Sequence, residues 1–153
     1  MSQEEIQCVV FQLAQTRFAI EIQVVNEIIV RPEITPVPQA PLWAEGIANL
    51  RGHVLPVVDV RKRLGLDDSV APTHALVLTL DGELLGMLVE GVSEVLRIPL
   101  DQVVPAPPEM QATHEGLVQG IYTWQDRFIL LWDSARLHGT AEHAGLLTVR
   151  PSA

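Results

Sequence analysis

The feature that most constrains the fold is an internal repeat of short apolar segments. Seven positions keep their character 67 residues later: Leu13, Phe18, Ile20, Ile22, Val25, Glu27 and Ile28 correspond to Leu80, Leu85, Met87, Val89, Val92, Glu94 and Val95. A second block recurs 74 residues later, from Gly46, Ile47, Leu55 and Asp59 to Gly120, Ile121, Ile129 and Asp133. Two similar halves of short strands predict a mainly β fold with two packed barrels. A parallel sheet would instead need longer helices between its strands.

Each half contains the same order of hairpins and proline segments. Apolar runs separated by short polar turns predict successive strands at 9–13 and 18–22. They predict hairpins at 47–50 with 54–58, 75–80 with 84–89, and 121–124 with 128–132. The Asp-Gly pair at 81–82 is the strongest of these turn signals. Proline-rich stretches at 35–41 and 104–108 are predicted to be edges or connectors, because proline cannot donate a ladder hydrogen bond.

A short capped helix is predicted after the second strand pair of each half. Asp59 is the expected N-cap of the first helix and Gly65 its stop, and Asp133 occupies the equivalent cap position in the second half. Capping explains the two aspartates better than a catalytic carboxylate pair does. The basic run 61–63 falls within the first helix, and we expect it to form a solvated face.

The length of 153 residues fits one domain. We expect a single domain over residues 6–139, made of repeat halves at about 6–66 and 73–139, followed by a flexible tail at 140–153. Neither half is long enough to be comfortably stable alone, so the halves should share a core. Exchange of strands between the halves is left open.

Composition narrows the possible partners. The formal net charge is −9, which argues against nucleic acid and against anionic membranes, since both require a basic surface. Hydrophobic residues make up 48% and charged residues 19% of the chain, a balance that predicts a folded protein with apolar binding surface.

The single cysteine and the chain start predict a reducing, cytoplasmic setting. Cys8 has no second cysteine to pair with and lies in an apolar strand, so we expect a small buried hydrophobe rather than a nucleophile. The first five residues are polar and acidic, unlike a secretory signal, and no apolar run approaches the roughly 20 residues of a membrane helix.

No catalytic, metal or cofactor site is predicted. The chain has no His-x-x-x-His pair, no Gly-x-Ser-x-Gly nucleophile turn and no phosphate-binding glycine loop. Two charged residues stand out instead. Glu27 interrupts an apolar stretch, and Arg51 lies at a hairpin tip, where a guanidinium can bind a partner's carboxylate or carbonyls.

Several segments together resemble the CheW family. They are 18–22, 25–28, 37–38, 46–52 and 56–61 in the first half, and 86–95 and 105–107 in the second. The Asn-Leu-Arg-Gly sequence at 49–52, followed by Pro-Val-Val-Asp at 56–59, is the most specific of these. The similarity covers about residues 6–139. It implies two packed five-stranded SH3-like barrels with short helical turns.

The resemblance also implies a function and a site. CheW-like adaptors join chemoreceptors to the histidine kinase CheA, binding the kinase regulatory domain and the receptor's cytoplasmic tip, and they are recruited from the cytoplasm to membrane receptor arrays. Carried over by position, the receptor-binding groove comprises Val25, Glu27, Gly46, Asn49, Arg51, Gly86 and Val95. The valines would line the groove, and the glycines would let the partner approach closely. Glu27 and Arg51 would orient the partner, or alternatively would form a mutual ion pair.

Two alternative functions stay open, and three residues differ from the family pattern. An adaptor of a related pathway, such as type IV pilus or gliding motility control, would have the same fold and grooves. A small-molecule binder is less supported, because no phosphate cradle or aromatic clamp is visible. His53, Trp124 and Trp132 differ from the family pattern and raise the possibility of an altered partner choice.

Overall fold

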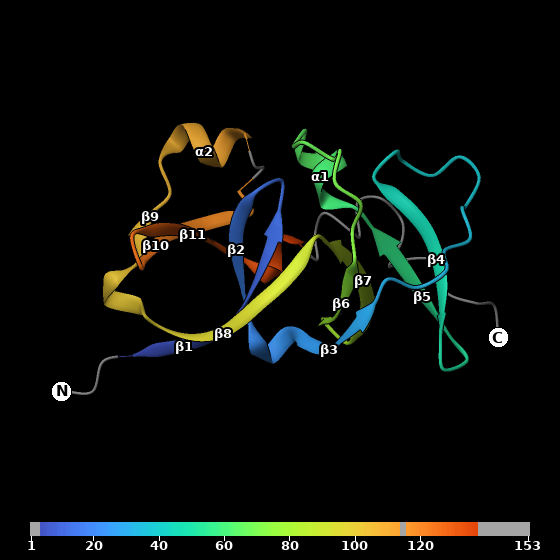
Figure 1. Ribbon diagram of the computed structural model, residues 1–153, viewed down its shortest axis with the longest axis horizontal. Coiled ribbons are helices and arrows are strands. Elements are labelled where there is room, and N and C mark those ends of the chain that lie inside the picture. The colour runs from blue at the N-terminus through green and yellow to red at the C-terminus, as the bar shows by residue number, and fades with distance from the viewer. Residues whose placement is uncertain (1–3, 114–115, 138–153) are drawn as a thin grey trace.

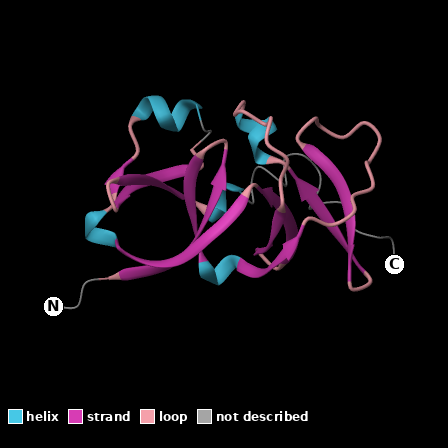
Figure 2. Ribbon diagram, viewed as in Figure 1, coloured by secondary structure: helices cyan, strands magenta, loops and turns pink. Residues whose placement is uncertain are grey.

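Strands dominate the architecture, as expected from the sequence (Figure 1 and Figure 2). The computed structural model describes residues 4–113 and 116–137. The strands are β1 (Glu5–Leu13), β2 (Thr16–Glu21), β3 (Val25–Val30), β4 (Ala44–Leu50), β5 (His53–Val58), β6 (His74–Leu80), β7 (Glu83–Val89), β8 (Gly91–Pro99), β9 (Val104–Pro105), β10 (Val118–Trp124) and β11 (Arg127–Trp132). The helical elements are η1 (Ile22–Val24), α1 (Val60–Leu64), η2 (Leu100–Gln102) and α2 (Pro108–Thr113).

Each of the two sheets takes strands from both repeat halves. The order is β8-β1-β2-β11-β10-β9 in the six-stranded sheet and β3-β6-β7-β5-β4 in the five-stranded sheet. The hairpin β1–β2 therefore lies among strands of the second half, and β6–β7 lies among strands of the first. Parallel pairs, β2 with β11 and β5 with β7, join the exchanged hairpins to their sheets. Neither half could complete its sheet without the other.

The three predicted hairpins form, and the two strands predicted at 9–13 and 18–22 also pair as a hairpin; all four have two-residue turns. Both residues of each turn have positive φ: Ala14 and Gln15, Arg51 and Gly52, Asp81 and Gly82, and Gln125 and Asp126. This is the backbone pattern of type I′ turns, whose twist matches that of paired strands. Only two of these turns contain glycine, so the strand pairing must stabilise the other two against the local steric cost.

Strands β3 and β8 were not predicted as strands. They contain the Val-x-Glu repeat, which mixes charged and apolar residues, and each lies at the edge of a sheet with one neighbour in the ladder. A bulge between Val10 and Phe11 shifts the pairing of β1 with β8. Edge strands with one exposed face lack a continuous apolar run, so their signal in the sequence is weak. Helix α2, beside the second proline stretch, was also missed.

One apolar cluster contains residues of both sheets, which confirms the expected shared core. At its centre the Trp132 ring contacts Phe11 and Phe18 with centroid separations of 5.2 Å in each case. Trp132 is 0% exposed, so the suggestion that it changes partner choice by direct contact is wrong. Trp124 lies half-buried beside a smaller cluster.

The first capped helix forms as predicted, but its basic residues do not form a solvated face. The Asp59 side chain accepts a hydrogen bond from the Arg61 backbone N–H, and Gly65 ends α1 in the left-handed conformation. Arg61 is only 2% exposed, which contradicts the expected solvated face at this position. Lys62 stays near the surface and binds Glu45, with 2.6 Å between Nζ and Oε1.

Cys8 is buried, as expected. Burial, with the nearby charge of Glu21, raises the pKa of its thiol to about 12, so the thiol stays protonated at neutral pH. Within 4–113 and 116–137, no helix is long and apolar enough to cross a membrane. The tail expected at 140–153 lies outside the described residues, and the domain limits inferred from the repeat stay a prediction.

Candidate functional site

Strand β3 forms one wall of the candidate site. It pairs with β6 through Val25 and Glu27, while its other side is an edge of the five-stranded sheet. Exposure alternates along β3, as on a strand with one covered face: Ile28 is 43% and Val30 is 73% exposed. Val25 instead packs half-buried against the shared core.

Glu27 and Arg51 form a forked ion pair. Nη1 of Arg51 donates to Oε1 of Glu27 at 3.0 Å, and Nη2 donates to Oε2 in parallel. This is the alternative arrangement considered from the sequence, in which the two residues bind each other. A fork of two parallel bonds fixes the orientation of both side chains. The Arg51 side chain remains 66% exposed, so its outer face is accessible to a partner.

The ion pair bridges opposite edges of one sheet. Glu27 lies on β3 and Arg51 at the tip of the β4–β5 hairpin, and β3 and β4 are the two ends of the five-stranded order. Nearby, Thr35 and Ile47 exchange two backbone hydrogen bonds of 2.8 and 2.9 Å, which connect the chain after β3 to β4. These contacts curl the sheet on itself, as closure of a small barrel requires.

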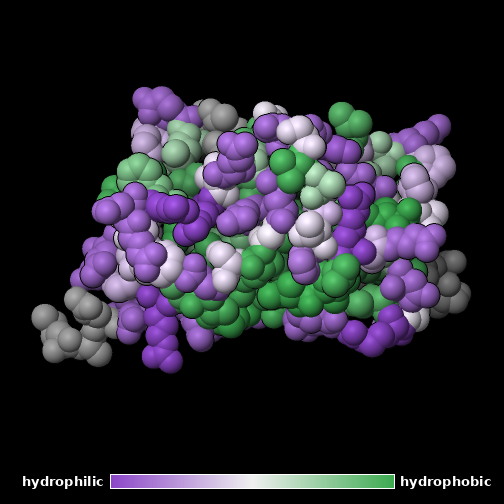
Figure 3. Space-filling model, in the orientation of Figure 1, coloured by the Kyte–Doolittle hydropathy of each residue, from purple (hydrophilic) through white to green (hydrophobic). Residues whose placement is uncertain are grey.

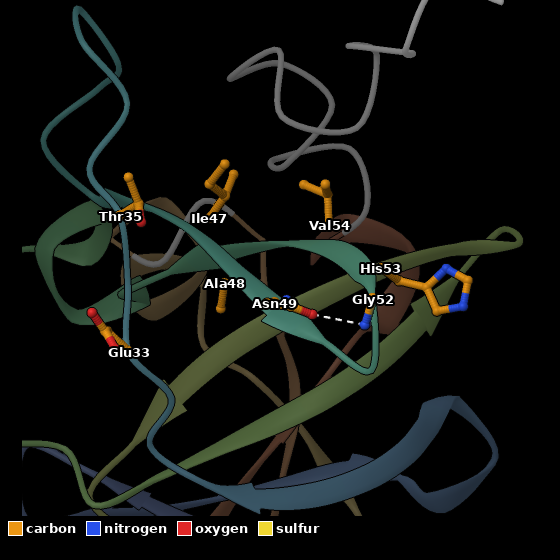
Figure 4. Close-up of a pocket in the computed structure, with 8 residues that line it drawn as sticks. All are labelled: Glu33, Thr35, Ile47, Ala48, Asn49, Gly52, His53 and Val54. Atoms are coloured by element: carbon orange, nitrogen blue, oxygen red, sulfur yellow. Dashed lines mark hydrogen bonds between the residues drawn. The ribbon is translucent and has the colours of Figure 1, made fainter.

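The hairpin tip presents Arg51 in a constrained backbone. Arg51 has a φ of 49°, and Gly52 has a φ of 85°. The side-chain oxygen of Asn49 accepts a hydrogen bond from the Gly52 backbone N–H at 2.7 Å (Figure 4). Asn49 therefore supports the turn that positions Arg51.

Charge interaction shifts the pKa of both ion-pair partners. Hydrogen bonds from Arg51 lower the pKa of the Glu27 carboxyl below its ordinary value. The same bonds raise the pKa of the Arg51 guanidinium. Both groups are thus charged at neutral pH, so the hairpin tip presents a guanidinium beside a carboxylate.

The two predicted glycines are buried against their own chain. A Cβ on Gly46 would lie 2.1 Å from the Thr35 backbone oxygen, and Gly46 has a φ of 143°. A Cβ on Gly86 would lie 3.0 Å from a methyl carbon of Leu55. Contacts within the protein therefore leave no free space for a side chain at either glycine. Close approach by a partner at these positions stays a prediction.

An apolar patch lies across the edge strands of both sheets. Val95 on β8 is 48% exposed, and Ile28 and Val30 project from β3. In the space-filling view, apolar surface covers the lower middle of the molecule, where Figure 1 places β8 and β3 (Figure 3). We call Ile28, Val30 and Val95 the edge patch. Ile28 and Val30 were not predicted as site residues, because the sequence at 25–30 does not alternate between apolar and polar residues and so does not show which side chains are exposed.

A shallow pocket of about 300 Å³ is lined by the β4–β5 hairpin and by the chain at 33–35 (Figure 4). Its lining comprises Glu33, Thr35, Ile47, Ala48, Asn49, Gly52, His53 and Val54. Of the predicted site residues it contains only Asn49. Val54, one of these lining residues, is 68% exposed.

The predicted set therefore separates into three groups. Glu27 and Arg51 bind each other, with Asn49 beside them; Val25 and Val95 lie on edge strands of different sheets; Gly46 and Gly86 are buried. Among the described residues, no three histidine, cysteine or acidic side chains gather closely enough to hold a metal ion. The exposed features are an apolar patch and a charged hairpin tip, which suit protein recognition.

Comparison with known proteins identifies similar chains over most of this length. The family model for the CheW-like domain matches residues 7–142. The chain is 31% identical to the chemotaxis protein CheW of Rhizobium meliloti, over 80% of this chain and 81% of the relative. It is 25% identical to Protein PilI of Pseudomonas aeruginosa, over 91% and 77% of the two chains. The crystal structure of the scaffolding protein TtCheW from Thermoanaerobacter tengcongensis superposes with a TM-score of 0.78 and 30% identity, covering 86% of each chain.

Proposed function

The chain belongs to the CheW-like domain family, and from this premise we propose that it is a non-catalytic adaptor that joins chemoreceptors to the histidine kinase CheA. The observation that carries the proposal is similarity over nearly the whole described chain to chemotaxis CheW proteins and to a structure described as a scaffolding protein. We further propose that the protein acts in the cytoplasm and is recruited to receptor arrays at the membrane.

The receptor tip is expected to bind at the edge patch and the Arg51 hairpin. A helical partner docks through apolar anchors in a groove, with a few polar clamps to set its direction. The edge patch, with half-buried Val25 beside it on β3, supplies apolar surface, and the forked pair of Glu27 and Arg51 supplies the clamp. Asn49 stabilises the hairpin turn through its bond to Gly52. Gly46 and Gly86 allow Thr35 and Leu55 to pack closely against the backbone of the five-stranded sheet.

A second candidate is an adaptor of a related pathway, such as type IV pilus or gliding motility control. The similarity to Protein PilI supports it. The same fold and groove would serve both pathways, so the partner kinase distinguishes the two candidates. The matches to CheW proteins from several bacteria favour chemotaxis.

The test is calorimetric binding to two probes. These are the regulatory domain of the CheA kinase and a helical hairpin peptide of a chemoreceptor tip, both from the same genome. We expect micromolar or tighter binding to the kinase domain. Arg51→Ala and Glu27→Ala should keep that binding while losing affinity for the receptor tip.

Arg127→Ala is the matched control, because it removes an exposed arginine from the equivalent hairpin of the other sheet. It should leave receptor-tip affinity near that of the wild type. Absence of binding to the CheA regulatory domain would reject the chemotaxis proposal. Binding to a pilus-pathway kinase instead would support the second candidate.

A further inference from the structure

The buried guanidinium of Arg61 connects three separate segments. Nε and Nη2 donate to the two oxygens of Asp59 at 3.0 and 2.8 Å. Nη1 donates to the Val70 carbonyl at 2.6 Å and to Oε2 of Glu90 at 2.8 Å. Arg61 thus binds the N-cap residue of α1, the linker between the repeat halves at Val70, and Glu90 at the connection between β7 and β8.

Glu90 lies where the chain crosses between sheets. It follows β7 of the five-stranded sheet and precedes β8 of the six-stranded sheet. Its Oε2 accepts a hydrogen bond from the Ala14 backbone N–H at 2.8 Å, and its own N–H donates to the Gln12 carbonyl at 3.0 Å. Through Glu90, the Arg61 network reaches the β1–β2 turn of the opposite sheet.

The repeat shows that the fold does not require this network. By the spacings of 67 and 74 residues, the positions equivalent to Glu90 and Arg61 are Gln23 and Ala135. Neither can form a corresponding ion pair, yet the chain also crosses between the two sheets at η1, which joins β2 to β3. Burying three charges carries a desolvation cost that hydrogen bonds must offset, and an apolar replacement is often equally stable. Stability alone therefore does not explain why Asp59, Arg61 and Glu90 are buried together, and we looked to the relative orientation of the segments that they connect.

The network and the edge patch lie on opposite sides of the junction between the sheets. Figure 1 shows α1 and the β1–β2 turn along the upper side, with β3 and the middle of β8 along the lower side. A connection on one side of such a junction limits rotation of the sheets about the shared core. Such a rotation would move β8 relative to β3, and with them Val95 relative to Ile28 and Val30.

We propose that Arg61 and Glu90, with Asp59, form a clasp that sets the angle between the two sheets and thereby the spacing of the edge patch. Arg61 and Glu90 are positioning residues in this view, acting on a partner through β3 and β8. The part of the inference that concerns receptor binding rests on the proposed function; the part that concerns the angle does not.

The angle is measured with spin labels on the outer hairpins of the two sheets, introduced by Val54→Cys and Thr123→Cys, both at exposed positions. Buried Cys8 stays unlabelled in the folded protein because its thiol is inaccessible and protonated. Pulsed electron paramagnetic resonance gives the distance distribution between the labels. Glu90→Gln should stay folded, because the amide keeps the size and the acceptor oxygen, and should broaden or shift this distribution.

The second variant combines Arg61→Met and Glu90→Met with Asp59→Asn, since it removes all three buried charges while asparagine can still cap α1. Glu45→Gln is the matched control, because it breaks the Lys62 pair of the same helix away from the junction. The control should reproduce the wild-type distribution.

Receptor-tip affinity of Glu90→Gln should fall by about tenfold, as expected for a residue that modulates a site without contacting it. Unchanged distance distributions in both clasp variants would overturn the clasp. A changed distribution with unchanged receptor affinity would overturn its link to the edge patch. If the wild type binds no receptor tip, the proposed function fails, and the distance measurement still decides whether the clasp sets the angle.

Discussion

Two arginines ten residues apart form ion pairs with opposite physical settings. Arg51 binds Glu27 at the surface, with 66% of its side chain exposed, whereas Arg61 binds Asp59 and Glu90 with 2% exposed. Water and salt screen the first pair, but they screen a buried pair much less. The same two chemical groups thus form a solvated surface pair in one place and a buried network in the other, where loss of a single partner leaves a charge without its counter-ion.

Arg61→Ala is expected to have the largest effect. It leaves the Asp59 and Glu90 carboxylates buried without a cation, which typically costs about 3–5 kcal/mol of unfolding free energy. Urea denaturation followed by tryptophan fluorescence measures this loss. Lys62→Ala, on the same helix, should cost less than about 1 kcal/mol, as for most surface pairs. Similar values for the two variants would remove the distinction between the buried Arg61 network and the half-buried Lys62–Glu45 pair.

Gly46→Ala should destabilise the five-stranded sheet more than loss of the surface pair does. The added Cβ would overlap the Thr35 backbone oxygen, and the left-handed φ of 143° disfavours any side chain. We expect a loss of about 1–3 kcal/mol. Gly82→Ala is the control with a positive φ but open space, and should lose less. An equal loss in both would show that backbone conformation, and not the contact with Thr35, governs closure.

Arg51→Ala should change stability little, because its partner Glu27 can be solvated once the pair is broken. Urea midpoints of wild type and variant should differ by much less than for Arg61→Ala. Raising the salt concentration should reduce the difference between wild type and Arg51→Ala further. A large, salt-independent loss would mean that the surface pair is an essential part of barrel closure.

The smallest effect concerns acid pH. Because Arg51 lowers the Glu27 pKa, the folded protein releases this proton more readily than the unfolded chain does. The stabilising contribution of the pair is fully present above the ordinary value of 4.5 and is lost as the pH falls through the lowered pKa. Carbon-detected NMR titration should place the Glu27 midpoint below 4.5 in the wild type and closer to it in Arg51→Ala. Identical midpoints would contradict the forked pair.

Local patterns in the sequence sufficed for the hairpins, the α1 cap and the family. A two-residue turn depends on its own backbone, so Asp81 and Gly82 indicate it without tertiary information. The cap at Asp59 likewise involves a bond to a residue only two positions away. The site residues were placed by resemblance, and the pairing of Glu27 with Arg51 was one of two arrangements considered.

The tertiary structure alone decided which strands share a sheet and which charges are buried. The repeat predicts two similar units, but exchange of β1–β2 with β6–β7 satisfies the same local pattern as separate halves. Arg61 and Lys62 are neighbours in one basic run, yet Glu90 meets only the first. Local propensity acts over a few residues, whereas burial depends on segments brought together from across the chain, so no short-range signal distinguishes the buried arginine from its half-buried neighbours.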